Sequence, residues 1–212
     1  MRVTLEELKN DKSCREYKVL EKREMLLFAK ESLKKWNIVK VLYNVLFILI
    51  AIIVYFQIVK MNDLKNIIIN AVGAILFTFI ITNIVHEYFH NLAFKILGAG
   101  SRAKFKFMAK NFHLYVVNKE FVVNKREFIF VEMFPFVILN LILSLIAVFL
   151  VQYRIFIIFL IFFHVAMTTQ DFGFVSFTID NKSKEVYVYT DDFGKLHFIE
   201  RFKDNVRKLK RS

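Results

Sequence analysis

Proline, cysteine and glycine are scarce in this sequence, which has one Pro, one Cys and five Gly among 212 residues. Collagen-like, disordered and low-complexity classes are excluded, because they need abundant Gly and Pro or little apolar content. The lone Cys14 excludes an internal disulfide and a cysteine-based zinc site. Acidic residues are also outnumbered, 19 against 31 Lys and Arg, which leaves a net charge of +12.

The abundant class is hydrophobic, at 57% of the chain with 26 Phe, and it is gathered into runs. A basic soluble protein would suggest nucleic acid, but here the basic residues flank apolar runs and form no aromatic-basic groove motif. We therefore expect the lipid bilayer, and not nucleic acid, as the partner of the basic residues. Four runs approach or reach the ~20 residues that cross a bilayer as a helix. The four runs are residues 41–59, 67–97, 128–151 and 155–179.

The distribution of Lys and Arg predicts the orientation of these helices. Residues 1–40 contain 11 of them, residues 98–127 contain 7 and residues 180–212 contain 9, whereas the other connections carry very few. Positive charge concentrates on the cytoplasmic side. We expect a multi-pass protein of the cell membrane with both termini and the middle loop in the cytoplasm. Residues 1–35 are too charged for a signal peptide, so the first run is expected to be the membrane anchor.

Three segments outside the runs have patterns of their own. Residues 1–37 include a stretch from Leu20 to Trp36 with an apolar stripe at helical spacing, which predicts an amphipathic helix lying on the membrane or packed on the protein. Alternating residues in the loop 98–127 and in the tail 180–212 predict short β-hairpins that join into one small sheet. The expected fold is all-α and polytopic, with residues 38–179 as a membrane core, plus this cytoplasmic β element.

The second run contains the pentapeptide His86-Glu87-Tyr88-Phe89-His90, an HExxH motif. On a helix the two histidines share a face and can bind one Zn²⁺, while Glu87 lies at the edge of that face as a general base. Ionisable residues inside an apolar helix are expensive and usually mark a functional site. The alternative is a helix end at the headgroup level with solvated polar residues.

Zinc needs a third protein ligand, and Asp171 in the fourth run is the favoured candidate. A carboxylate among phenylalanines is costly unless it is paired or metal-bound. Because the second and fourth runs both travel toward the cytoplasm, the histidines and Asp171 reach similar depths. Glu132 and His164 are the competing candidates. His164 lies about 10 Å along the helix from Asp171, so it is expected to be a hydrogen-bonded interior histidine.

Two further polar or helix-bending residues lie in the third run. Asn140 is expected to make a hydrogen bond between helices. Pro135 is expected to bend its helix and open room beside the site, or to be a tolerated transmembrane proline.

The chain resembles a family of small bacterial membrane proteins described as putative zincin peptidases, a domain of unknown function. Three segments carry the likeness: His86–His90, Asn124–Pro135 and Gln170–Asp171. The metal set is similar to that of site-2-type intramembrane zinc metalloproteases, although here Phe172 separates Asp171 from Gly173 and no proline lies nearby. The resemblance implies His86, His90 and Asp171 as zinc ligands and Glu87 as general base.

The leading hypothesis is a zinc-dependent, membrane-embedded endopeptidase that cleaves membrane proteins or membrane-proximal peptides. A strand near the site would hold the extended substrate by edge pairing. Two other classes remain open: a non-catalytic zinc-binding membrane adaptor, and a small transport or immunity protein that uses the intramembrane His and Asp for protons. The sequence names neither the substrate nor the oligomeric state.

Overall fold

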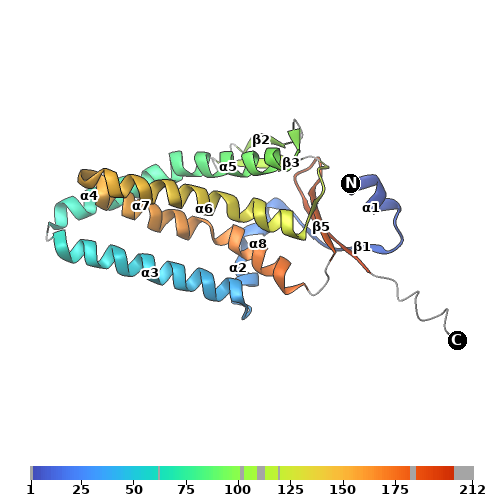
Figure 1. The fold of residues 1–212 in the computed structure, drawn as a ribbon, viewed down its shortest axis with the longest axis horizontal. Coiled ribbons are helices and arrows are strands. Elements are labelled where there is room, and N and C mark those ends of the chain that lie inside the picture. The colour runs from blue at the N-terminus through green and yellow to red at the C-terminus, as the bar shows by residue number, and fades with distance from the viewer. Residues whose placement is uncertain are drawn as a thin grey trace.

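A bundle of long apolar helices forms most of the molecule, and the strands lie toward one of its ends (Figure 1). This computed structural model describes residues 2–61, 63–100, 103–108, 113–118, 120–181 and 185–202, with only the backbone of 103–108 and 113–118. The predicted tail beyond residue 202 lies outside the described residues. Helices α1 (Leu5–Asn10) and α2 (Lys22–Lys34) lie at the same end as the strands.

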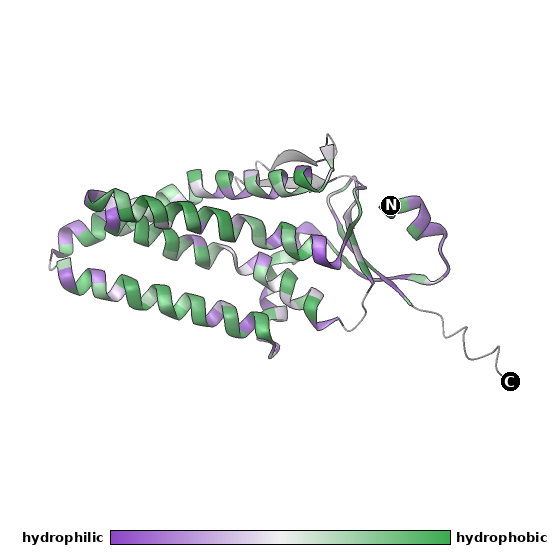
Figure 2. Ribbon diagram, viewed as in Figure 1, coloured by the Kyte–Doolittle hydropathy of each residue, from purple (hydrophilic) through white to green (hydrophobic). Residues whose placement is uncertain are grey.

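Three helical segments are long and apolar enough to cross a membrane. They are α3 (Ile38–Met61), the continuous segment α4 (Leu64–Phe77), η1 (Thr78–Thr82) and α5 (Asn83–Ile96), and α6 (Lys125–Phe149). A fourth span exists if the bent pair is counted as one: η4 (Val151–Tyr153) with α7 (Arg154–Met167), then α8 (Thr169–Asp180), with a bend of 42°. The first three predicted runs are confirmed as continuous helical segments, whereas the fourth, expected as one helix, is divided between α7 and α8. The helix surfaces are largely apolar (Figure 2).

Local sequence signals fix several helix starts. Thr4 and Glu7 form the capping box that their spacing predicts, and Asn124 with Glu127 forms a second one at the start of α6. Asp63 accepts a hydrogen bond from the Asn66 backbone N–H at the start of α4. The start of α6 matters for the site because this helix packs against α5 and α8.

The main sheet has four antiparallel strands in the order β1-β6-β5-β4. The predicted tail hairpin is confirmed, with a turn at Asp191–Gly194 whose Gly194 has φ +82°. The loop 98–127 joins it only in part: its last strand, β4, pairs with β5, with Val123 opposite Val188 and Asn124 opposite Tyr187. The hairpin β2-β3 does not join, contrary to the sequence expectation. Because β1 and β4 occupy both edges of the tail hairpin, β2 and β3 form a separate two-stranded sheet. The strands are β1 (Cys14–Leu20), β2 (Ala103–Met108), β3 (His113–Asn118), β4 (Val123–Asn124), β5 (Val186–Thr190) and β6 (Leu196–Arg201).

Helix α2 packs against α8, one of the two packings that the amphipathic pattern left open. Its residues Ala29 and Ser32 are buried, and the Ser176 hydroxyl donates to the Ser32 carbonyl at 3.1 Å. Gly173 permits the close approach, because a Cβ there would lie 2.5 Å from Cα of Ala29. Leu27 on the other side of α2 is exposed.

An aromatic core attaches the sheet to the helices. Phe128 of α6 lies edge-on to Phe198 of β6, with ring centroids 5.6 Å apart. Phe177 of α8 contacts both Phe28 of α2 and Phe198. The sheet therefore packs on α2, α6 and α8 together and fixes α8 relative to α6.

Candidate metal centre

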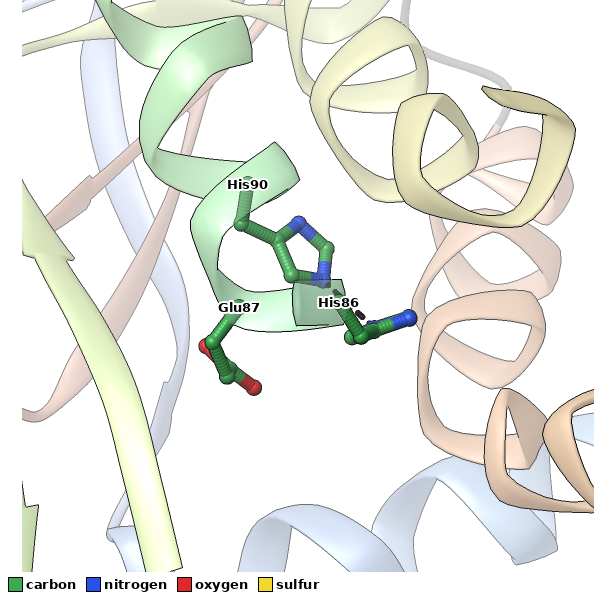
Figure 3. Close-up of side chains that lie close together, drawn as sticks. All are labelled: His86, Glu87 and His90. Atoms are coloured by element: carbon green, nitrogen blue, oxygen red, sulfur yellow. Dashed lines mark hydrogen bonds between the residues drawn. The ribbon is translucent and has the colours of Figure 1, made fainter. Parts of the chain in front are cut away.

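Helix α5 holds the two histidines of the HExxH motif one turn apart on a buried face. His86 and His90 are 4% and 8% exposed, and their Nε2 atoms lie 3.1 Å apart (Figure 3). The preceding segment η1 is a π-helix, a feature that often accompanies functional sites. Thr78 and Thr82, at the same spacing of four, are buried too. The buried face of this span therefore carries polar side chains at every fourth residue from Thr78 to His90.

Glu87 follows His86 on the same turn and is partly exposed. One ligand atom each from His86, Glu87 and His90 lies within 4.8 Å of the other two, a cluster that could hold a metal ion. In Figure 3 the Glu87 carboxylate stands apart from the contact between the two rings. In this position the Glu87 carboxylate can contact a molecule bound beside the two histidines, because it is not packed between their rings.

Asp171, in the first turn of α8, brings a carboxylate to the same two nitrogens. Oδ2 lies 3.2 Å from Nε2 of His86, and Oδ1 lies 3.8 Å from Nε2 of His90. Asp171 is 6% exposed. The chain bends by 42° between α7 and α8, at Thr168, three residues before Asp171. The structure therefore brings together His86, His90 and Asp171, from the two spans that the sequence analysis paired.

His164 lies behind His86. Its Nε2 is 3.0 Å from Nδ1 of His86, and its Nδ1 is 3.1 Å from Oδ1 of Asn140. The Asn140 amide nitrogen donates to the Phe136 carbonyl at 2.7 Å, so its oxygen faces His164. The expected interior hydrogen bond of His164 and the expected interhelix bond of Asn140 are confirmed, as one and the same contact.

These contacts fix the tautomers of both motif histidines. His164 donates from Nδ1 to Asn140 and must accept at Nε2, so His86 donates from Nδ1. His90 donates from Nδ1 to the Val131 carbonyl at 3.1 Å. In its neutral form each imidazole then carries its lone pair on Nε2, the form that binds metals.

Three acceptors consequently face one another in a buried space. Asp171 Oδ2 is buried and makes no hydrogen bond within the described part of the chain, although His86 Nε2 is 3.2 Å away. Facing lone pairs repel unless a cation lies between them. Four-coordinate zinc with ligands at 2.0–2.1 Å would separate neighbouring ligand atoms by about 3.3 Å. Two observed separations fit this requirement: 3.1 Å between the two Nε2 atoms, and 3.2 Å between Nε2 of His86 and Oδ2 of Asp171. The other carboxylate oxygen, Oδ1, lies 3.8 Å from Nε2 of His90.

The remaining candidate, Glu132, does not reach the two nitrogens. It lies on α6 next to Val131, near enough to interact electrostatically with His90. Among the described side chains it forms no hydrogen bond or ion pair with either motif histidine. Glu132 thus belongs to the wall of the site.

Sequence reasoning missed Tyr43 of α3. Its hydroxyl lies 2.8 Å from the Thr169 hydroxyl, two residues before Asp171. The available signal was a tyrosine in the first apolar run, because a phenol among apolar residues usually finds a hydrogen-bond partner. Tyr43 tethers the start of α8 to α3.

Comparison with protein families matches residues 79–187 to a family described as "putative zincin peptidase". The matched segment contains the HExxH motif and Asp171. No curated protein and no solved structure matches the chain.

Proposed function

Because the chain belongs to the family described as putative zincin peptidases, which its residues 79–187 match, we propose that it is a zinc-dependent, membrane-embedded endopeptidase. The observation that carries the proposal is the convergence of two imidazole Nε2 atoms and a buried carboxylate at 3.1 to 3.8 Å. The donor set of two histidines and one carboxylate is that of zinc hydrolases with one open coordination position.

His86, His90 and Asp171 would bind the zinc ion, and Glu87 would act as the general base. When bound, zinc lowers the pKa of a coordinated water and polarises the scissile carbonyl. Glu87, partly exposed beside the cluster, accepts a proton from the attacking water and returns it to the leaving amine. The Nδ1 contacts of both histidines keep their Nε2 atoms aimed at the ion throughout.

The surroundings of the site support an extended substrate taken from the membrane or its surface. The site lies within apolar helices, whose exposed residues suit contact with lipid. Strands β2 and β3 pack beside α5. Among the described strands, β2 and β3 pair only with each other, so an outer edge of this hairpin can pair with an unwound peptide, whose scissile bond would otherwise be shielded inside a helix. Membrane proteins and membrane-proximal peptides are therefore the proposed substrates.

The charge pattern and the fold support one orientation in the cell membrane. The strands, α1 and α2 lie toward one end of the bundle, and all of these elements come from the basic segments 1–40, 98–127 and 180–212. Positive charge favours the cytoplasmic side. We place this end, with both termini, in the cytoplasm.

Replacing Glu87 with glutamine tests the proposed chemistry. Glutamine keeps the size of the side chain but accepts no proton, so Glu87→Gln should bind zinc like the wild type and lose cleavage by at least about 100-fold. Glu31→Gln, on the exposed face of α2, is the matched control and should keep full activity.

Purified full-length protein in proteoliposomes would be assayed for zinc content and for cleavage of a co-reconstituted membrane-peptide library. Cleavage by Glu87→Gln at the wild-type rate would refute this mechanism. Stoichiometric zinc in a closed coordination shell, with no cleavage by the wild type, would favour the adaptor class instead. Activity that survives removal of zinc by a chelator would favour the proton-transport class.

A further inference from the structure

Helix α6 anchors both motif histidines through their Nδ1 atoms, by two different routes. His86 is reached through His164 and Asn140, whereas His90 is reached directly by a backbone carbonyl, that of Val131, at 3.1 Å. A backbone carbonyl inside a helix is normally occupied by the N–H four residues later. The availability of the Val131 carbonyl therefore needs an explanation.

Pro135, four residues after Val131, supplies it. Pro135 lies inside α6 and is buried, and it is the only proline in the sequence. Proline has no N–H, so it cannot bond the Val131 carbonyl, and its ring pushes against the carbonyl four residues earlier and turns it outward. Val131 itself is 0% exposed. Its carbonyl would be a buried acceptor lacking its helical donor if His90 did not supply one.

We propose that Pro135 is a positioning residue for the metal centre: it keeps the Val131 carbonyl open for the Nδ1–H of His90. The hydrogen bond selects the tautomer in which Nε2 carries the lone pair and fixes the ring toward His86 and Asp171. The ligand role of His90 rests on the proposed function. The tautomer of His90 in the metal-free protein does not, so the two can be tested separately.

A proline that only shapes the helix makes a different prediction. A bend would provide space for the site whichever nitrogen of His90 carries the proton. The positioning role requires a protonated Nδ1 on His90 before any metal binds. Histidine side-chain nitrogen NMR distinguishes the two tautomers, because protonated and unprotonated ring nitrogens resonate far apart.

The experiment uses the full chain, ¹⁵N-labelled at histidine, solubilised in detergent and stripped of metal. His90 is assigned by comparison with His90→Gln. The wild type should show His90 protonated at Nδ1. Pro135→Ala restores an N–H that competes for the Val131 carbonyl, so His90 should shift toward the Nε2-protonated form. The zinc affinity of this variant, measured by competition with a chelating indicator, should fall by about 10- to 100-fold.

Asn140→Leu is the matched control on the same helix. It removes the acceptor of His164, so the signal of His86 should change and that of His90 should not. Pro135→Ala should give the reverse pattern. The proposal is overturned if Nδ1 of His90 carries no proton in the wild type, a result that needs no variant to fold. It is also overturned if folded Pro135→Ala keeps both the His90 signal and the zinc affinity of the wild type. Wild-type protein with the expected His90 signal but no zinc binding would refute the proposed function and leave the positioning contact standing.

Discussion

The substitution Gly173→Ala adds one methyl group outside the candidate metal centre and should nevertheless lower its zinc affinity. Gly173 lies on α8 two residues after Asp171, at the point where α8 meets α2. A Cβ built there would lie 2.4 Å from the carbonyl oxygen of Ala29 and 2.5 Å from its Cα and Cβ. Two of these three atoms are backbone, so a side-chain rotation cannot relieve the overlap.

The size of the effect follows from the overlap. Carbon atoms pack at about 3.5–4.0 Å, so α2 and α8 must separate by about 1 Å or more at this crossing. Overpacking of this kind costs about 1–3 kcal/mol of folding stability. A displacement of about 1 Å at a reacting centre can cost about 100-fold in rate. Because Asp171 is carried by α8, Gly173→Ala should lose both stability and zinc affinity.

Thermal unfolding and zinc titration of the full-length protein in detergent measure the two losses. Gly73→Ala is the matched control in another apolar helix, since its Cβ would come no nearer than 3.4 Å to Phe156. It should be neutral or stabilise the protein by up to about 1 kcal/mol. The double variant Ala29→Gly with Gly173→Ala should not recover, because the Ala29 backbone atoms remain.

Wild-type stability and zinc affinity in Gly173→Ala would refute the argument that α2 and α8 are in rigid contact. Full recovery in the double variant would place the clash on the Ala29 side chain alone. Loss of stability with unchanged zinc affinity would show that Asp171 is not held by the packing of α8 on α2.

Two further predictions concern carboxylates. Asp171→Ala should lose most bound zinc by elemental analysis, because one of the three proposed ligands is removed. Asp180→Asn, at the other end of α8, should keep its zinc, and equal zinc content in both variants would exclude Asp171 as a ligand. In the turn between β5 and β6, burial raises the pKa of Asp191, but backbone N–H bonds from Lys195 and Phe193 and the nearby His197 more than offset it and hold the pKa below its usual range. Asp191 therefore contributes stability above its unfolded pKa of about 3.9 that is lost as pH falls through the lower folded pKa. The unfolding temperature of the wild type should drop in this acid range more than that of Asp191→Asn, and parallel curves would contradict the prediction.

Local and periodic features of the fold could be predicted from the sequence. The apolar runs, the capping box at Thr4 and the tail hairpin depend on residues close together in the chain, so their signals survive without tertiary information. The meeting of the HExxH helix with Asp171 could be predicted from ligand type, from the cost of an unpaired carboxylate among phenylalanines, and from depth, because a membrane orders helices by position along one axis. The structure places them within 3.8 Å.

Features that depend on distant partners could not be predicted. Strand β1 is rich in charge and precedes an amphipathic helix, so nothing in its own residues indicates that β6 will pair with it. The break before Thr169 has neither proline nor glycine to mark it. For His164 the sequence predicts an interior hydrogen bond but not its partners. The structure shows that it contacts Nδ1 of His86, on another helix, as well as Asn140.

The order of strands in the main sheet has a consequence for how the protein is made. Strand β1 borders β6 and no other described strand, yet residues 14–20 and 196–201 lie near opposite ends of the sequence. At about 5–20 residues per second, a ribosome needs roughly 10 to 35 seconds to advance from one to the other. During that interval all the apolar helices are synthesised, while the pairing partner of β1, strand β6, does not yet exist. Closure of the sheet over α2 and α8 is therefore expected to be a late step of biogenesis, and the candidate metal centre, to which α8 contributes Asp171, should mature only after residues 196–201 have been made.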